Sequence, residues 1–181
     1  MRKLFEGDLV RLAAYDKEKD VEFEAKWVRD SDYMRLLDDM PGSLYSIKQM
    51  QEWIEGIGGD QGFYAIRTLA DDKYIGTISL GGFAWTDRNA WVGIGIGDRD
   101  YWGKGYGSDA MKVLLHYAFT ELNLHRVNLS VFAFNERAIK SYEKSGFKYE
   151  GTQREAIYKE DQRWDIITMG ILQSEWQAMQ G

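Results

Sequence analysis

The stretch DRDYWGKGYGSDAM, residues 98–111, constrains the fold of this chain more than any other segment. Gly103, Gly105 and Gly107 occupy every second position, and an apolar helical pattern starts directly after them. Because glycine weakens both helices and strands, three glycines at this spacing predict a tight turn. The turn follows a strand-like segment at 89–97 and opens a helix at about 106–122, so it joins a strand to a helix.

Strand and helix patterns follow one another along the whole chain. Strand-like segments are expected at 4–15, 62–69, 74–85, 89–97 and 125–132, with a closing hairpin around Glu160–Gln162. Helical patterns are expected within 16–40, a region ended by Pro41, and at 46–57, 106–122 and 135–147. No linker, repeat or low-complexity segment separates them. The order predicts a single α/β domain over residues 1–181, with helices flanking a mixed sheet.

Three residues are expected to begin or end helices. Ser46 precedes the segment SIKQMQEWIEGI and Asn135 opens NERAIKSYEKSGF, and both are residue types that cap helix N-termini. Gly146 follows the last turn of the second of these helices, where glycine favours the left-handed conformation that stops a helix. Asn135 and Tyr142 are seven residues apart, so the helix places them on about the same face.

The glycine stretch also has the chemistry of a phosphate-binding turn. A helix N-terminus carries unpaired N–H groups and a partial positive charge, and the preceding glycines let phosphate oxygens approach the backbone. Lys104 adds a cation. The stretch matches neither a P-loop, because Lys104 is followed by Gly105, nor a dinucleotide fingerprint, because the spacing is Gly-x-Gly-x-Gly. A glycine-rich turn without a ligand is the alternative.

The preceding strand, WVGIGIG, exposes a second row of glycines. Gly93, Gly95 and Gly97 alternate with apolar residues, so one face of the strand is bare. Bare positions on a strand indicate a close neighbour. That neighbour is either a bulky core side chain or an extended ligand that runs along the strand towards the turn.

Composition excludes several classes of protein and site. The formal net charge of −6 disfavours non-specific binding of nucleic acid. The chain has no cysteine and two histidines, so neither a disulfide framework nor a metal site is expected. No window approaches 18 uninterrupted apolar residues and the N-terminus has no signal-peptide core, so we expect a cytoplasmic protein without a membrane partner.

The two glycine features and the following helix together resemble the GNAT superfamily of acyl-CoA-dependent N-acyltransferases. The family's cofactor-loop pattern, Gln/Arg-x-x-Gly-x-Gly/Ala, is matched by Trp102, Gly105 and Gly107, and residues 135–147 look like its Asn-x-x-Ala…Tyr-x-x-x-Gly-Phe segment. The resemblance covers about residues 5–172. The branch of ribosomal-protein N-terminal acetyltransferases and spermidine acetyltransferases is the most similar. It implies about seven mostly antiparallel strands that splay apart between strands 4 and 5.

The resemblance implies acetyl-CoA as cosubstrate, bound in that splay. The pantetheine arm would pair with the backbone of the strand, the pyrophosphate would lie on the amides of the turn, and a backbone N–H near Ile96 would polarise the carbonyl oxygen. The residues implied in cofactor binding are Ile94, Gly95, Ile96, Gly97, Trp102, Gly103, Lys104, Gly105, Tyr106, Gly107, Ser108 and Asn135. Trp102 departs from the usual Gln or Arg, which leaves backbone amides and the helix end as the main phosphate anchors.

Tyr142 matches the residue that serves as general acid in the family, and packing beside Gly146 is its structural alternative. The resemblance implies direct attack of an amine on the thioester, because the chain offers no cysteine nucleophile and no Ser/His/Asp set. A base must take the proton of the amine. Glu24, Asp98 and Glu155 are the candidates, with a water chain as the alternative.

The acceptor is expected to be a primary amine. Segment 16–60 and the loop at 85–90 should shape its pocket, where Asp38 and Asp39 suit a cationic group or simply lie in an exposed loop. By resemblance, a peptide N-terminus ranks ahead of a polyamine or another small amine such as an antibiotic. A CoA-binding regulatory module is the non-enzymatic alternative, a flavin or nucleotide site is a third, and a homodimer is compatible with each.

Overall fold

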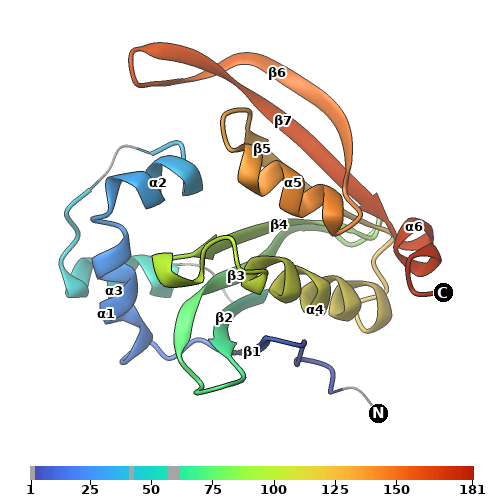
Figure 1. Ribbon diagram of the computed structural model, residues 1–181, viewed down its shortest axis with the longest axis horizontal. Coiled ribbons are helices and arrows are strands. Elements are labelled where there is room, and N and C mark those ends of the chain that lie inside the picture. Colours follow the sequence, from blue (N-terminus) through green and yellow to red (C-terminus); the bar gives the residue numbers. More distant parts are fainter. Residues whose placement is uncertain (1–2, 41–42, 57–61) are drawn as a thin grey trace.

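The computed structural model describes residues 3–40, 43–56 and 62–181, which form one seven-stranded sheet flanked by helices (Figure 1). In their order across the sheet, the strands are β1 (Val10–Ala14), β2 (Gly62–Thr68), β3 (Tyr74–Ala84), β4 (Asn89–Ile96), β5 (Arg126–Phe132), β7 (Gln162–Leu172) and β6 (Lys148–Lys159). The helices are α1 (Asp20–Trp27), α2 (Ser31–Leu37), α3 (Ile47–Gly56), α4 (Tyr106–Thr120), α5 (Glu136–Lys144) and α6 (Gln173–Ala178), with a 3₁₀ turn, η1, at Arg99–Tyr101. The predicted α/β class and the mixed sheet are confirmed.

The sheet opens between its fourth and fifth strands, as expected. Strands β4 and β5 run parallel and pair only from Asn89 to Trp91, whereas all other neighbours are antiparallel. The Asn128 side chain closes the paired end by donating from Nδ2 to the carbonyl oxygen of Ala90 at 3.1 Å. Beyond Trp91 the two strands separate, and within the described residues they form no further pairs with each other.

Helix α4 covers one face of the sheet and is tied to the first strand by a buried carboxylate. Leu114 and Leu115 lie in the main core. Asp109, in the first turn of the helix, accepts hydrogen bonds from the backbone N–H groups of Leu9 and Val10 at 2.8 and 3.1 Å. Since these bonds satisfy a buried charge, they fix the start of the helix relative to the sheet.

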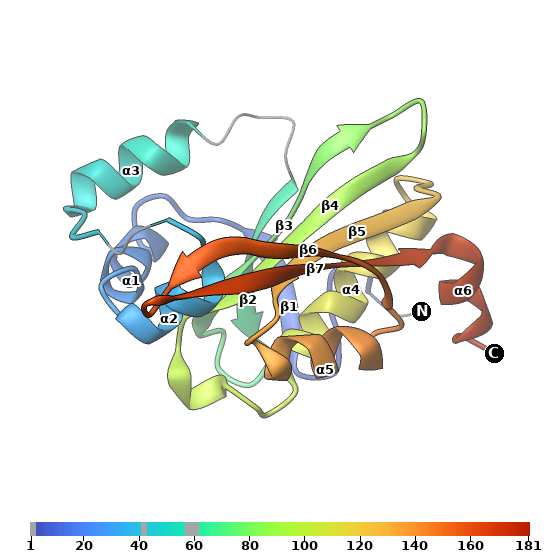
Figure 2. The same cartoon turned by 90° about the horizontal axis from the view of Figure 1, so that it is seen from above.

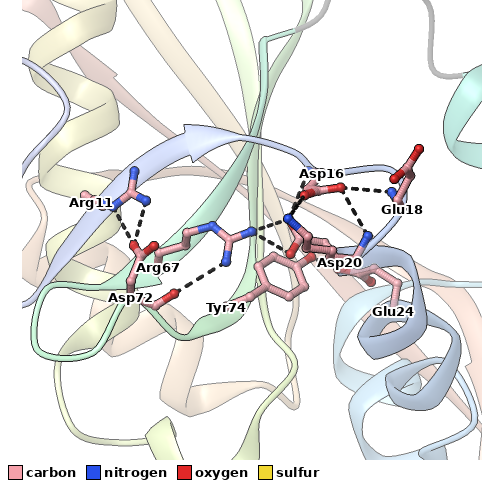
Figure 3. Close-up of polar contacts among 9 residues, drawn as sticks. Arg11, Asp16, Glu18, Asp20, Glu24, Arg67, Asp72 and Tyr74 are labelled. Carbon is pink, nitrogen blue, oxygen red and sulfur yellow. Dashed lines mark hydrogen bonds and ion pairs between the residues drawn. The ribbon is translucent and has the colours of Figure 1, made fainter.

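A buried polar network anchors α1 to the opposite face of the sheet (Figure 3). The Arg67 guanidinium of β2 donates to both carboxylate oxygens of Asp20, at 2.6 and 2.7 Å. One turn later, Glu24 accepts a hydrogen bond from the Tyr74 hydroxyl of β3. Burial raises the pKa of the Glu24 carboxyl to about 7, although the Tyr74 hydrogen bond favours the ionised form.

The last two strands form a long hairpin that reaches back over α2 (Figures 1 and 2). Glu160 and Asp161 at its tip both have positive φ angles, +53° and +59°. The hairpin contacts α2 through an ion pair between Arg35 and Glu160 at 2.9 Å. The Lys159 ammonium also donates to the backbone carbonyl of Asp38. These contacts join the C-terminal and N-terminal parts of the chain at the open side of the sheet.

Most local predictions are confirmed, but one strand is shorter than expected, one helix was not predicted, and two positions lie outside the described residues. Ser46 and Asn135 accept capping hydrogen bonds from backbone N–H groups three residues on, and Gly146 has a φ of +95°. The strand expected over 4–15 is shorter, with β1 preceded only by an isolated bridge. Helix α6 has no counterpart in the sequence analysis. Pro41 and position 57 of the helix expected at 46–57 lie outside the described residues.

Among residues 3–40, 43–56 and 62–181, no helix is both long and apolar enough to cross a membrane.

Candidate active site

The turn before α4 has the backbone conformation that its glycines predict. Gly103 and Gly105 have positive φ angles of +71° and +90°, and Gly105 is the N-cap of α4. Since this left-handed region disfavours side chains, glycine suits both positions. Apart from Gly103 itself and its two chain neighbours, no described residue has an atom within 4 Å of the place where a Gly103 Cβ would stand. The turn therefore leaves room beside the positive end of the helix dipole.

Trp102 holds a basic residue beside this turn. Its indole N–H donates to the carbonyl oxygen of Ile96 at 2.6 Å, which fixes the ring against the end of β4. The guanidinium of Arg137, from α5, lies 4.2 Å from the centre of the ring, at cation–π distance. Burial lowers the pKa of Arg137, although a guanidinium keeps its charge near neutral pH. Trp102 stands where the family usually has Gln or Arg, and the cation beside the turn is instead the Arg137 guanidinium that stacks on its ring.

A first cavity of about 390 Å³ joins the turn to the open end of β4 and to α5. Nine of the twelve residues expected to bind the cofactor line it, namely Ile94, Gly95, Ile96, Trp102, Gly103, Gly105, Gly107, Ser108 and Asn135. The Oγ atoms of Ser108 and Ser141 lie 2.7 Å apart and join α4 to α5 along its wall. The structure therefore brings most of the predicted set together around one space.

The other three expected cofactor residues do not line this cavity. Gly97 donates its backbone N–H to Ile75 at 2.9 Å, so that amide has a partner within the sheet. Tyr106 packs edge-to-face on Tyr101, with ring centroids 4.8 Å apart. Lys104 is exposed. Local spacing in the glycine stretch did not distinguish these residues from those that face the cavity.

A second cavity, of about 440 Å³, lies on the other side of the gap between β4 and β5. It is lined by α2, α3, α5 and the strands, and its acidic and aromatic residues are Asp38, Asp39, Trp53, Phe63, Phe132 and Tyr142. Six residues line both cavities: Leu36, Leu37, Ile94, Gly95, Asn135 and Tyr142. The two spaces therefore meet at the open end of β4, opposite the face of α5 that carries Asn135 and Tyr142.

Tyr142 is the titratable residue at this junction. Its ring packs against Phe147, with centroids 6.1 Å apart, and burial raises the pKa of its hydroxyl to about 12. The hydroxyl forms no hydrogen bond with any residue that the structure describes. At neutral pH it is a protonated donor that has no partner among those residues, which suits a group that gives a proton to a ligand.

Asn135 places the start of α5 against α2. Its Oδ1 caps the helix by accepting from the Ala138 N–H at 3.2 Å, and its Nδ2 donates to the carbonyl oxygen of Leu36 at 3.4 Å. One side chain thus joins the two helices that face each other across the junction. The helix-cap alternative for Asn135 is confirmed; a ligand contact remains a prediction.

The bare face of β4 is filled by side chains at two of its three glycines. A Cβ on Gly95 would lie 2.5 Å from the Tyr33 hydroxyl oxygen and 2.8 Å from Leu37, and a Cβ on Gly97 would overlap the Trp27 ring. The interpretation that an extended ligand explains the glycines is therefore wrong at these positions. Bulky side chains from α1 and α2 need the space, as the alternative stated.

The three carboxylates suggested as general bases line neither cavity. Glu24, on α1, accepts a hydrogen bond from the Tyr74 hydroxyl. Asp98 pairs with Lys73 at 2.8 Å and caps η1. Burial acts to raise the pKa of its carboxyl, but these contacts outweigh it and hold the pKa low. Glu155 has a positive φ of +52° on the exposed hairpin. None of the three carboxylates therefore lies where it could take the proton of an amine at the junction, and their positions in the fold could not be read from the sequence.

Sequence analysis missed aromatic residues that line the two cavities, namely Tyr33 in the first and Trp53, Phe63 and Phe132 in the second. Tyr33 lies in a charged helical segment and is not one of its spaced apolar positions, and Phe63 and Phe132 read as ordinary strand residues. Trp53 reads as part of the apolar face of its helix, yet it is more than half exposed beside the cavity. No pattern within each segment marks these side chains, since the two cavities draw them from four separate elements.

The domain model for the Acetyltransferase (GNAT) domain matches residues 10–148. The chain belongs to the GNAT acetyltransferase family. The predicted resemblance is thereby confirmed, and this GNAT enzyme transfers an acetyl group from acetyl-CoA to an amine nitrogen. The matched range starts at β1 and ends with the first residue of β6, so it contains both sides of the gap and all of α5.

The names of similar proteins indicate the same kind of activity. An SPbeta prophage-derived uncharacterized N-acetyltransferase of Bacillus subtilis is 28% identical over 97% of this chain and 96% of its own. A spermidine N(1)-acetyltransferase of Vibrio cholerae is 34% identical over 59% of this chain and 61% of its own. A crystal structure of spermidine N-acetyltransferase from Vibrio cholerae, in complex with CoA and spermine, has a TM-score of 0.83 at 26% identity, covering 93% and 98% of the two chains.

The first cavity of this GNAT enzyme fits the charge of acetyl-CoA. Arg137, Lys140 and Lys144 line it from α5, opposite the N-terminal end of α4. Basic side chains and a helix N-terminus both favour phosphate groups. The left-handed glycines keep side chains off the turn between them, so phosphate oxygens can approach the backbone.

Proposed function

We propose that this enzyme acetylates a primary amine of a small, flexible polycation of the polyamine class, and that the amine attacks the thioester directly. The observation that carries the proposal is the meeting of two cavities at Tyr142, one basic and one acidic. Each substrate has its own space, and the reacting atoms have a common place at the open end of β4. No covalent acyl-enzyme is needed when both substrates reach that place together.

The residues of the first cavity would hold acetyl-CoA, which supplies an acetyl group activated as a thioester. The turn at Gly103–Ser108 and the basic residue Arg137 would bind its phosphates, and Asn135 would contact its arm. Tyr142 holds a proton at its hydroxyl, at the junction, for the sulfur that departs when the new C–N bond forms. Since the three candidate carboxylates lie elsewhere, we assign the proton of the attacking amine to water in the second cavity.

The second cavity supports a cationic acceptor. Asp38 and Asp39 lie at its α2 end. A hydrogen bond with the Asp38 carboxyl raises the pKa of Asp39, and burial and the negative charge of Asp38 act in the same direction. Aromatic side chains and the hydroxyls of Ser79 and Ser130 line its length. This combination suits an alkyl chain that carries ammonium groups, because the rings pack on methylenes while carboxylates and hydroxyls bind the charges.

A peptide N-terminus, ranked first from the sequence, is the second candidate. A putative ribosomal N-acetyltransferase of Bacillus subtilis is 33% identical over 61% of this chain and 60% of its own. The spermidine acetyltransferase structure aligns with nearly the whole chain and contains spermine. Together with the acidic second cavity, that likeness puts the polyamine class ahead.

Release of free thiol from acetyl-CoA, measured with a panel of amines, tests the proposal. The panel contains spermidine, spermine, a monoamine of matched length, peptides with free N-termini and an aminoglycoside. We expect the polyamines to give the highest kcat/KM, with an acetyl group on nitrogen by mass spectrometry. A preference for peptides, or acetylation of oxygen alone, contradicts the acceptor class. No thiol release with any amine, despite binding of acetyl-CoA, supports the regulatory-module alternative.

A further inference from the structure

Tyr33 on α2 directs its hydroxyl at β4 in the first cavity. The residue is 3% exposed and lines that cavity. Its hydroxyl oxygen lies 2.5 Å, and its Cζ atom 3.4 Å, from the place where a Gly95 Cβ would stand. A residue larger than glycine at position 95 would displace the phenol. The glycine and the tyrosine are therefore a matched pair that puts a hydroxyl beside the strand.

The Tyr33 hydroxyl has no hydrogen-bond partner among the residues that the structure describes. A buried hydroxyl without a partner costs stability, so such a group needs an explanation. Tyr74, in the same aromatic layer, donates to Glu24. The Tyr15 hydroxyl also lacks a partner, but it is fully enclosed and its residue lines neither cavity. Tyr33 combines an unpartnered hydroxyl with a place in the cavity wall.

This hydroxyl lies close to the junction of the two cavities. Gly95, which it approaches, is one of the six residues that both cavities share, and so is Leu37, whose side chain meets the same point. Burial, together with the nearby Glu24 carboxylate, raises the pKa of Tyr33 well above its usual value. The phenol therefore keeps its proton at neutral pH and has a hydrogen bond to donate.

We propose that the Tyr33 hydroxyl donates a hydrogen bond to the carbonyl oxygen of the acyl group, and so distinguishes acetyl-CoA from the product CoA. The inference rests on the proposed position of the thioester at the junction. An acyl carbonyl there is an acceptor for the phenol, whereas free CoA has no oxygen at that position. Tyr33 thus binds the part of the cosubstrate that changes in the reaction, from the side of the sheet opposite α4.

The variant Tyr33→Phe tests the assignment, with binding of acetyl-CoA and of CoA measured separately by calorimetry without an amine. Loss of one net hydrogen bond predicts acetyl-CoA affinity lower by about five- to tenfold and an unchanged affinity for CoA. Tyr149→Phe is the control, because the Tyr149 hydroxyl is exposed on β6, contacts Thr152 and lies outside both cavities.

Three results would overturn the assignment. They are an equal loss of affinity for both ligands, no loss for either, and a change confined to the KM of the amine. The variant without ligand should melt at or above the wild-type temperature, since it loses an unpaired hydroxyl; a lower temperature would show that the hydroxyl has a protein partner. If wild-type protein bound neither ligand, the proposed function itself would fail, which is a distinct outcome.

Discussion

The two cavities that meet at Tyr142 are built from different parts of the chain and in different ways. The first takes most of its wall from two short stretches, 94–108 and 135–144, and four glycines expose its backbone. The second takes its lining residues from eight elements, namely α2, α3, α5, β2, β3, β4, β5 and β7. One is a local backbone device beside a helix end, whereas the other is an assembly of distant side chains.

This difference corresponds to the two substrates. A phosphate-bearing cosubstrate can be held by amides and a helix dipole, which require turn geometry more than particular side chains. An acceptor must be selected by the shape and charge of a pocket, which only side chains provide. Substitutions on the two sides should therefore affect different constants, and the junction should affect the chemical step.

The largest expected effect is at the junction. Tyr142→Phe keeps the ring and its packing on Phe147 but removes the proton donor. We expect kcat to fall by about 10²–10⁴-fold, with acetyl-CoA affinity unchanged, because the lost interaction forms mainly in the transition state. Steady-state kinetics with calorimetry provides both values, and Tyr149→Phe is the control. A wild-type kcat, where chemistry limits the rate, would show that Tyr142 is structural.

The next effect separates charge from shape in the first cavity. Gly105→Asp places a carboxylate at the N-cap of α4, and Gly105→Asn places a neutral group of the same shape there. Asparagine tolerates the left-handed conformation, so we expect the Asn variant to retain most of its acetyl-CoA affinity. Repulsion between like charges should weaken the Asp variant by at least about 100-fold. Thermal shift with acetyl-CoA measures both; equal affinities would exclude phosphate binding at this turn.

A smaller effect is expected on the acceptor side. The double variant Asp38→Asn, Asp39→Asn should raise the KM of a polyamine by about tenfold, since two carboxylates near the surface each contribute up to about 1 kcal/mol. The difference should shrink at high salt, and acetyl-CoA affinity should not change. Glu155→Gln removes a carboxylate outside both cavities and serves as the control. A polyamine KM that does not change in the double variant would refute the cation site.

Arg137→Met should weaken acetyl-CoA binding by about fivefold, the scale of one partly exposed charge contact. The comparison ligand is acetyl-pantetheine, which lacks the nucleotide phosphates. Its affinity should be the same in the variant and the wild type if Arg137 binds phosphate. Equal losses for the two ligands would show instead that the substitution disturbs the Trp102 stack and the wall of the cavity.

The smallest effect on catalysis is expected from Glu24→Gln, which should change kcat less than about twofold because Glu24 lines neither cavity. Its effect is on stability. The pKa of this carboxyl is about 7 in the folded state and near 4.5 in the unfolded state. Its contribution to stability is therefore fully present below pH 4.5 and is lost as the pH rises to about 7. The wild type should lose up to about 3 kcal/mol relative to the variant across that window, measured by urea unfolding. Parallel pH profiles would contradict a buried, protonated Glu24.

Local features of the first cavity could be predicted from the sequence, because short-range rules determine them. A left-handed turn requires glycine at 103 and 105, and Asn135 caps the helix that follows it. The family motifs then imply the splay and the position of Tyr142. The sequence did not show which glycines face the cavity. Gly97 was expected there, but it donates its N–H within the sheet, and Trp27 fills the space beside it.

The second cavity could not be predicted, because no one segment contains it. Phe63 and Phe132 become neighbours of Asp38 only after α2 and the strands have packed together. Helix α6 was missed for a related reason. Its six residues are too few for a stable isolated helix, and Trp176 fixes it by packing on Phe119, with ring centroids 5.4 Å apart.

The initial-rate pattern, with acetyl-CoA and a polyamine both varied, tests most directly whether the acetyl group passes straight across the junction. Transfer between two occupied cavities requires a ternary complex, so double-reciprocal lines should intersect, and intact protein incubated with acetyl-CoA alone should gain no acetyl mass. Parallel lines together with an acetylated protein would show a covalent intermediate, and the two cavities would then not act at the same time.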